Sequence, residues 1–305
     1  MEMELTLGPI AYHWTAETRR DFYARVADEA PIDTVYLGEV ICSKRAPFFE
    51  AEIPRIAERL VRGGKRVVLS TLAEVMLPRE RKATADLAEV QDFEIEVNNA
   101  AGLQARGNRP HRIGPFLNAY NEATIAWMAG QGATHFCLPT EMPGPAIAAA
   151  ASAAAGLGVG VEVQVFGRAP LAVSARCYHA RAHSRTKDNC QFVCEEDPDG
   201  MPLKTLDGRS VLRVNGIQTQ SESYVNLMAE LPELAANGVG HARLMPQQVD
   251  MIAVARIFRD RIDGRLDAEG ASAALSGVCG AASFSNGFYH GAAGYRRIEA
   301  AAVRA

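Results

Sequence analysis

The feature of this sequence that most constrains its fold is a repeated alternation of short β-rich runs with longer helical stretches. The β-rich runs predict strands at residues 5–9, 34–37, 66–69, 93–97, 112–115, 135–138, 161–165 and 241–245. Helical patterns lie between many of them, at residues 16–28, 48–62, 71–92, 122–130 and 141–156. Eight strands that alternate with crossover helices predict an α/β fold, a (β/α)8 barrel of the TIM type or an incomplete version of one.

The alternative fold is a doubly wound sheet. No Gly-x-Gly-x-x-Gly follows the first strand, and this weighs against the dinucleotide-binding form of that fold. The 305 residues fit one barrel domain, because α/β barrels occupy about 250 residues as a single unit. The regularity breaks once, at an insert of about residues 167–238 that contains a possible extra strand at 210–214. The tail at 249–305, rich in alanine and glycine, is predicted to be helical.

The charge of the chain limits its partners. Lysine and arginine number 32 against 36 acidic residues, which gives a net charge of −4, so we expect no nucleic-acid partner. No apolar run is long enough to span a bilayer, and the first residues show neither a basic stretch nor an apolar core of the signal-peptide kind. We therefore expect a cytoplasmic protein.

Three of the six cysteines are clustered, in the arrangement Cys177-x12-Cys190-x3-Cys194. In the cytosol such clusters are more typical of metal sites than of disulfides, and this one suits zinc or an iron–sulfur cluster. Cys42 is the best-placed fourth ligand, because it follows the second strand, and the carboxyl ends of all barrel strands share one face. Cys137, inside a strand, and Cys279, in the tail, are expected to be buried elsewhere.

The residues around these three cysteines do not decide between zinc and an iron–sulfur cluster. Arg176, Arg181, Arg185 and Lys187 would offset the negative charge of a [4Fe–4S] cluster bound to four thiolates, yet a zinc ion with four thiolates carries the same charge. His179 or His183 could instead complete a Cys3His zinc site. The alternative is that these basic residues only form a solvated loop face.

Polar residues at the predicted carboxyl ends of strands are candidates for catalysis. They are Glu39, Asn98, Asn99, Asn118, Asn121, Glu141 and Gln164, with Glu162 on the same face of its strand as Gln164. Glu39, beside Cys42, and Glu162, inside an apolar strand, are the two predicted catalytic residues. The alternative for each is a helix cap or a structural hydrogen bond. No Ser-His-Asp spacing, HExxH motif or Walker loop is present.

The run EVQVFGRAPLAVSARC, which ends at Cys177, resembles the signature of the U32 peptidase family. The runs LGEVICSKR, around Cys42, and DNCQFVC, which ends at Cys194, resemble the branch of that family that serves ubiquinone biosynthesis. The resemblance covers nearly the whole chain, including the NGFYHG run at residues 286–291.

This resemblance implies an oxygen-sensitive [4Fe–4S] cluster bound by Cys42, Cys177, Cys190 and Cys194. It also implies a heterodimer with a paralogous subunit that holds its own cluster, in which a ubiquinone precursor undergoes oxygen-independent ring hydroxylation. Other proteins of the same pathway are further possible partners. The alternatives are a U32-type peptidase, a non-catalytic electron-relay or structural partner of the paralogue, and an RNA-base hydroxylase, which the acidic net charge does not favour.

The sequence departs from the common family signature at one place. The signature has His-Gly followed by a cysteine, whereas this chain has Phe166, Gly167 and, at the cysteine position, Pro170. In the ubiquinone branch a cysteine after the second strand takes the place of the missing ligand, which agrees with the position of Cys42. The loss of the histidine also disfavours a peptidase.

Four aromatic residues lie among small residues near the end of the chain: Phe284, Phe288, Tyr289 and Tyr295. Such aromatics can anchor a subunit interface, or the tail can simply close the barrel's own side.

Overall fold

Eight parallel strands close into a barrel in the computed structural model, which describes residues 3–299. These strands are β1 (Glu4–Leu7), β2 (Thr34–Leu37), β3 (Arg66–Ser70), β4 (Glu94–Val97), β5 (His111–Ile113), β6 (Ala133–Cys137), β7 (Gly160–Val173) and β11 (His241–Leu244). Each pairs in parallel with the next, and β11 pairs with both β7 and β1, which closes the ring. The predicted (β/α)8 barrel is confirmed in its complete form.

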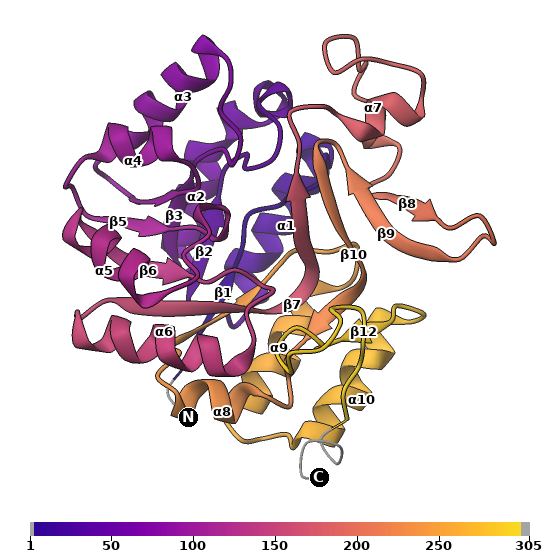
Figure 1. The fold of residues 1–305 in the computed structure, drawn as a ribbon. Helices are drawn as coiled ribbons and strands as arrows, with labels where there is room; N and C mark the ends of the chain where they lie inside the picture. The colour runs from indigo at the N-terminus through magenta and orange to yellow at the C-terminus, as the bar shows by residue number, and fades with distance from the viewer. Residues whose placement is uncertain (1–2, 300–305) are drawn as a thin grey trace.

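A helix follows each barrel strand and packs around the outside (Figure 1). The helices are α1 (Ala16–Glu29), α2 (Ile53–Arg62), α3 (Pro78–Ala88), α4 (Ala100–Arg106), α5 (Glu122–Gly130), α6 (Gly144–Gly156), α8 (Leu231–Ala236) and α9 (Met251–Ile262). α4 was not anticipated, because seven residues carry too little periodicity to be recognised. α3 begins later than predicted, at Pro78, where Glu80 accepts the backbone N–H groups of Met76 and Leu77 at 2.8 and 2.9 Å.

The stretch between β2 and α2 is also less helical than predicted. Two short 3-10 helices, η1 (Ser43–Phe48) and η2 (Glu50–Glu52), precede the α-helix. Pro47 within η1 has no backbone N–H to donate, so the chain cannot continue there as a regular helix.

β7 leaves the barrel partway along its length and carries the insert. Its first half lies between β6 and β11, whereas from Phe166 onward it pairs antiparallel with β10 (Gln218–Asn226). Gly167 at this switch has a φ of 104°, and a Cβ there would lie 2.8 Å from the Cβ of Met245. The predicted start of the insert, near residue 167, therefore coincides with a position that requires glycine.

The insert is a projecting antiparallel sheet with a short helix. β10 pairs with β9 (Ser210–Asn215), and β9 pairs with β8 (Met201–Lys204) (Figure 1). The short helix is α7 (Tyr178–Ala182), and its Ala180 packs with Val40 and Ile41 of the loop after β2. Only β9 was predicted. β8 has only four residues and contains a proline, and β10 is mostly polar, so neither shows the apolar alternation by which strands are recognised.

The predicted helical C-terminal region is confirmed, although its last described residues are not helical. α9 and α10 (Ala268–Cys279) are followed by β12 (Phe284–Ser285), which pairs with β10, and by non-helical chain as far as residue 299. Residues 300–305 of the predicted tail lie outside the described residues. Within residues 3–299, no helix is long and apolar enough to cross a membrane.

Candidate functional site

The four predicted ligand cysteines line one small cavity between the barrel and the insert. Cys42 comes from the loop after β2, and Cys177, Cys190 and Cys194 come from the segment between β7 and β8. The structure thus brings together residues that are 135 positions or more apart in the sequence, at the carboxyl ends of the strands. Lys44, Arg45, His179, Lys187 and Phe192 complete most of the lining.

The loop that presents Cys42 is shaped by Glu39. One carboxylate oxygen of Glu39 accepts the backbone N–H groups of Ile41 and Cys42, both at 2.9 Å. The side chain is 7% exposed and its other oxygen lies 3.8 Å from the Arg19 guanidinium. Gly38 makes the preceding turn at a φ of 134°, where a Cβ would lie 2.5 Å from the Ser70 carbonyl oxygen.

The insert holds its cysteines in a tightly turned segment. Cys177 caps α7, and its sulfur accepts the Ala180 N–H at 3.4 Å. Ser184, Gln191 and Phe192 adopt left-handed backbone conformations, with φ between 48° and 56°. Such conformations are costly for residues other than glycine and cluster at functional sites, and two of these three lie between Cys190 and Cys194.

A buried arginine lies against the thiols. Arg45 is 1% exposed and lines the cysteine cavity, and its Nε has no hydrogen-bond partner among the described residues. Burial raises the pKa of Cys42 and of Cys194, and the positive charge of Arg45 opposes that rise. The cavity therefore combines thiols that burial keeps protonated with a fixed cation that favours their anionic form.

This donor set fits a thiolate-bound cluster. Four cysteines are the complement that a [4Fe–4S] cluster requires, and a buried cation with a free N–H offsets the net negative charge of such a centre. Among residues 3–299, no three or more His, Cys, Asp or Glu side chains are arranged as a site for a single metal ion. A cluster places each thiolate on its own iron, so its ligands lie farther apart than around one ion.

The two histidines of the insert differ in position. His179 lines the cavity and is fully buried, and its Nε2 pairs with Asp197 Oδ2 at 2.8 Å. His183 is exposed and lies outside the cavity lining, and its Nδ1 donates to the His179 carbonyl oxygen at 3.0 Å. Of the two histidine alternatives for a Cys3His site, only His179 is near the cysteines.

The remaining cysteines lie apart from the cavity. Cys137 is at the end of β6 in the barrel interior, close enough to Arg243 and Glu162 for their charges to act on it. Cys279 ends α10 and packs in the main hydrophobic core.

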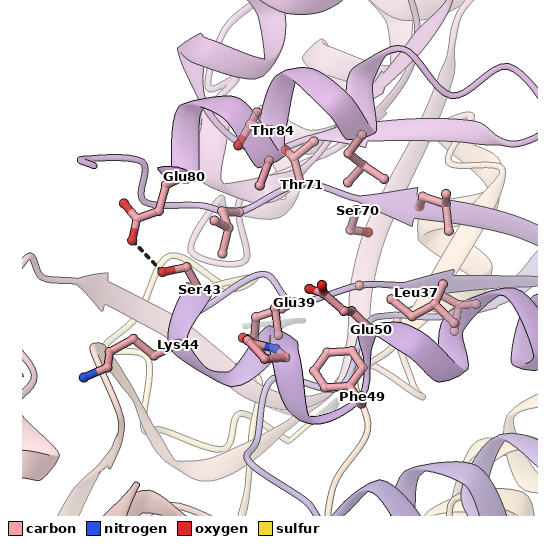
Figure 2. A pocket seen from close by; sticks show the side chains of 18 of the residues that line it. Leu37, Glu39, Ser43, Lys44, Phe49, Glu50, Ser70, Thr71, Glu80 and Thr84 are labelled. Carbon is pink, nitrogen blue, oxygen red and sulfur yellow. Dashed lines mark hydrogen bonds between the residues drawn. The ribbon is translucent and has the colours of Figure 1, made fainter. Parts of the chain in front are cut away.

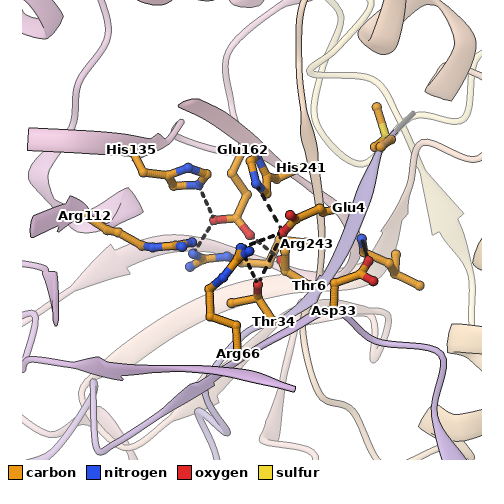
Figure 3. Close-up of polar contacts among 12 residues, drawn as sticks. Glu4, Thr6, Asp33, Thr34, Arg66, Arg112, His135, Glu162, His241 and Arg243 are labelled. Carbon is orange, nitrogen blue, oxygen red and sulfur yellow. Dashed lines mark hydrogen bonds and ion pairs between the residues drawn. The ribbon is translucent and has the colours of Figure 1, made fainter. Parts of the chain in front are cut away.

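Glu162, the second predicted catalytic residue, lies in a polar network inside the barrel (Figure 3). It is 0% exposed and receives hydrogen bonds from Tyr36 Oη at 2.8 Å and Arg243 Nη2 at 2.6 Å, and it pairs with His135 at 3.1 Å. Arg243 holds its pKa well below the usual range although burial acts in the other direction. Glu162 is therefore part of a hydrogen-bond and ion-pair network in the barrel interior, outside the lining of the cysteine cavity.

The other polar candidates divide between caps and internal contacts. Asn99 and Asn121 are N-caps of α4 and α5, which confirms the capping alternative for both. Asn98 and Gln164 are buried and hydrogen-bond to neighbouring strands and loops. Asn118 and Glu141 line a separate cavity of about 330 Å³ near the ends of β5 and β6.

Sequence reasoning missed Arg45 and its partner Asn215. Arg45 stands three residues after Cys42 in the quoted LGEVICSKR run, but nothing in that run shows that it is buried. Asn215 precedes Gly216 at the β9–β10 turn, and an Asn-Gly pair is a hairpin signal that could have located this turn.

Taken together, the chain is a (β/α)8 barrel whose strand-end loop and insert enclose a cysteine-lined cavity. The model of peptidase family U32 matches residues 17–299. The chain belongs to this family.

Solved structures with some likeness share 12% sequence identity with this chain. An uncharacterized B. cereus protein has a TM-score of 0.40, with 80% of this chain and 61% of that chain covered. Phospho-2-dehydro-3-deoxyheptonate aldolase from Thermotoga maritima has a TM-score of 0.42, with 93% and 72% covered. A fructose-1,6-bisphosphate aldolase from Coccidioides immitis, described as a candidate enzyme of that type, has 0.31, with 90% and 88% covered. This chain thus spans about three fifths of the B. cereus protein.

Proposed function

We propose that this chain is an iron–sulfur subunit similar to the ubiquinone biosynthesis protein UbiV, and that it supports oxygen-independent hydroxylation of the ubiquinone ring. The observation that carries the proposal is the convergence of Cys42 with Cys177, Cys190 and Cys194 on one cavity. Arg45 supports it, because a buried cation beside four thiols suits an anionic centre.

Different residues would have different roles in binding such a cluster. The four cysteines would bind it, Arg45 would offset its charge, and Glu39 would fix the backbone that presents Cys42. A bound iron–sulfur cluster supplies one-electron redox chemistry. The substrate of the complex would be a ubiquinone precursor, and the partner a UbiU-like paralogue with its own cluster.

The aromatic tail gives little support for the partner. Tyr289 is 5% exposed and packs over Gly144, and Phe284 and Phe288 lie against the barrel core. These three side chains pack on the barrel's own side, which is the alternative to a subunit interface. Only Tyr295, 74% exposed, is free to contact another subunit. The heterodimer therefore rests on the family resemblance.

A U32-type peptidase is the alternative function. His179 with Asp197 beside several cysteines has the composition of a cysteine-peptidase site. However, His179 is fully buried and Cys177 and Cys194 are 7% and 8% exposed, which disfavours their attack on a peptide bond, whereas Cys42 and Cys190 are partly exposed. The geometry favours a bound prosthetic group over a peptide substrate.

The decisive experiment is anaerobic purification, alone and with the paralogue, followed by iron and sulfide analysis. We expect about four irons per chain, lost on alanine substitution of Cys42, Cys177, Cys190 or Cys194. Cys137→Ala and Cys279→Ala are the matched controls and should keep their iron. A chain that contains no iron, or zinc instead of iron, would contradict the proposed cluster. Ring hydroxylation by this chain in a strain that lacks the paralogue would contradict the heterodimer.

A further inference from the structure

The cysteine cavity has a buried part and a part that is nearer to solvent. The buried residues of its lining are Arg45, Cys177, His179, Val193, Cys194 and Gly216. The partly exposed residues of its lining are Cys42, Lys44, Lys187, Cys190 and Phe192. Access from solvent to the buried thiols of Cys177 and Cys194 therefore depends on this second group of side chains.

Phe192, in the partly exposed group, packs against rings from two other segments. Its ring centroid lies 4.6 Å from that of Phe48 in η1 and 5.8 Å from that of His13 in the loop after β1. His13 and Phe48 are 5.0 Å apart, with an interplanar angle of 76°. Edge-to-face ring pairs at such distances are favourable beyond the area that they bury. The three rings thus connect the insert to two loops of the barrel beside the cysteine cavity.

The backbone of Phe192 depends on these ring contacts. Its φ of 53° and ψ of 34° lie in the left-handed region, which a residue with a bulky side chain rarely adopts. Such a conformation persists only where the surrounding contacts impose it. The position of the Phe192 ring in the cavity lining is therefore set by its contacts with Phe48 and His13.

Lys44 connects the two segments that supply the partly exposed cysteines. Its Nζ donates to the carbonyl oxygens of Lys187 and Asp188, at 2.8 and 3.0 Å, and lies 5.8 Å from the centroid of the Phe192 ring. Lys44 is two residues after Cys42, and Asp188 is two residues before Cys190. These bonds therefore hold the insert against η1 at the partly exposed part of the cavity.

η1 also borders a larger apolar cavity of about 580 Å³, lined by residues of β2, β3, α2 and α3 (Figure 2). There Ser43 donates to Glu80 of α3 at 2.5 Å, and the amino group of Lys44 points away from the other side chains drawn. η1 is thus bonded to the barrel through Ser43 and to the insert through Lys44. When the bonds of Lys44 break, we expect the insert to move and η1 to stay.

We infer that Phe192 and Lys44 form a closure of the cysteine cavity, which limits how fast reagents from solvent reach the buried thiols. The Phe192 ring covers the cavity, and the Lys44 bonds hold the covering segment in place. This inference concerns the thiols themselves and does not depend on a bound cluster. If the proposed cluster is present, the same closure should slow its loss to oxygen and to chelators, and that part rests on the proposed function.

Labelling of the metal-free chain with N-ethylmaleimide, without oxygen, measures access to each cysteine when the labelled peptides are identified by mass spectrometry. Phe192→Ala removes the ring, and Lys44→Met removes the two hydrogen bonds but keeps the side-chain length. Each should label Cys177 and Cys194 about tenfold faster than the unsubstituted chain does. Loss of the positive charge in Lys44→Met would by itself slow labelling, because it disfavours the reactive thiolate, so a faster rate must come from access.

Tyr178→Ala is the matched control. Tyr178 is an aromatic residue of the insert that is 48% exposed and lies outside the cavity lining, so its loss should leave the labelling rates unchanged. Cys137 and Cys279 are buried elsewhere and should label slowly in every variant. Unchanged rates at Cys177 and Cys194 in both test variants would overturn the closure. Equal acceleration at Cys137 would also overturn it, because the substitutions would then unfold the barrel rather than open one cavity.

Failure of this inference can be told apart from failure of the proposed function. A chain that never binds iron but shows the expected labelling pattern would overturn the cluster and keep the closure. A chain that binds the cluster, but whose variants lose it to a chelator no faster and label no faster than the unsubstituted chain, would keep the cluster and overturn the closure.

Discussion

Arg45 Nη2 donates to Asn215 Oδ1 over 2.9 Å, although the two residues are 170 positions apart. Both side chains also donate to the Ala11 carbonyl, Arg45 at 2.9 Å and Asn215 at 2.8 Å. These bonds join the loop after β1, the loop that carries Cys42 and the β9–β10 turn. The position of the cysteine cavity therefore depends on contacts among three distant segments, and Arg45 is central to them.

Arg45→Met should lower the iron content of the anaerobically reconstituted chain and shift the reduction potential of any remaining cluster downward. The substitution keeps bulk but removes a buried positive charge beside four thiolates, and an uncompensated negative centre is harder to reduce. Iron analysis and redox titration measure both effects. Arg176→Met, an exposed arginine of the same insert, is the control. Full iron with an unchanged potential in Arg45→Met would contradict the role given to Arg45.

If the chain binds the proposed cluster, its removal by air should loosen the insert and leave the barrel folded. The segment between Ser184 and Phe192 has strained backbone and few backbone hydrogen bonds, whereas the barrel strands are paired on both sides. Hydrogen exchange of the anaerobic and air-treated chain should therefore differ mainly at about residues 174–200. Loss of protection across the barrel strands would show instead that the cluster supports the whole fold.

Glu162→Gln should reduce the free energy of unfolding by about 3–5 kcal/mol, because it leaves the buried Arg243 without one of its two carboxylate partners. Urea-induced unfolding measures the change. Glu29→Gln is the control, since Glu29 and its partner Arg25 are 41% and 49% exposed and their pairing should contribute no more than about 1 kcal/mol. A Glu162→Gln chain that keeps its stability but loses hydroxylation with the paralogue would support the prediction that Glu162 is catalytic.

Stability should fall as the pH is lowered from about 6.5 to 5, in part because of His13. Burial, with the nearby charges of Arg45 and Arg19, lowers the pKa of His13 to about 4, whereas in the unfolded chain it is about 6.5. Between these values the unfolded chain binds more protons at His13, so the free energy of unfolding rises with pH and the full contribution is present above 6.5.

At pH 5 the His13 contribution lost is about 2 kcal/mol. His13 packs against Phe48 and Phe192 and neither of its ring nitrogens has a hydrogen-bond partner among the described residues, so His13→Phe should be tolerated. Chemical unfolding at pH 5 and pH 7.5 should show a smaller pH dependence for this variant. An unchanged dependence would assign the effect to other buried histidines, such as His111 and His135, whose pKa values burial also lowers.

The sequence by itself determined the barrel and the ligand candidates. The eight strands were found because runs such as residues 34–37 and 161–165 are short, apolar and separated by helical patterns, and this information is local. The proximity of Cys42 to the cysteines of the insert could be predicted without coordinates, because the carboxyl ends of all parallel barrel strands lie on the same face.

Only the tertiary structure decided which side chains surround those cysteines and which groups each buried carboxylate contacts. Glu39 and Glu162 look equivalent in the sequence, yet one holds the Cys42 loop and the other is enclosed by Arg243, Tyr36 and His135. The Arg45–Asn215 hydrogen bond and the apolar cavity lined by residues of β2, β3, α2 and α3 also depend on contacts between distant side chains. These contacts are determined by the packing of segments that are far apart in the chain, so no local sequence pattern predicts them.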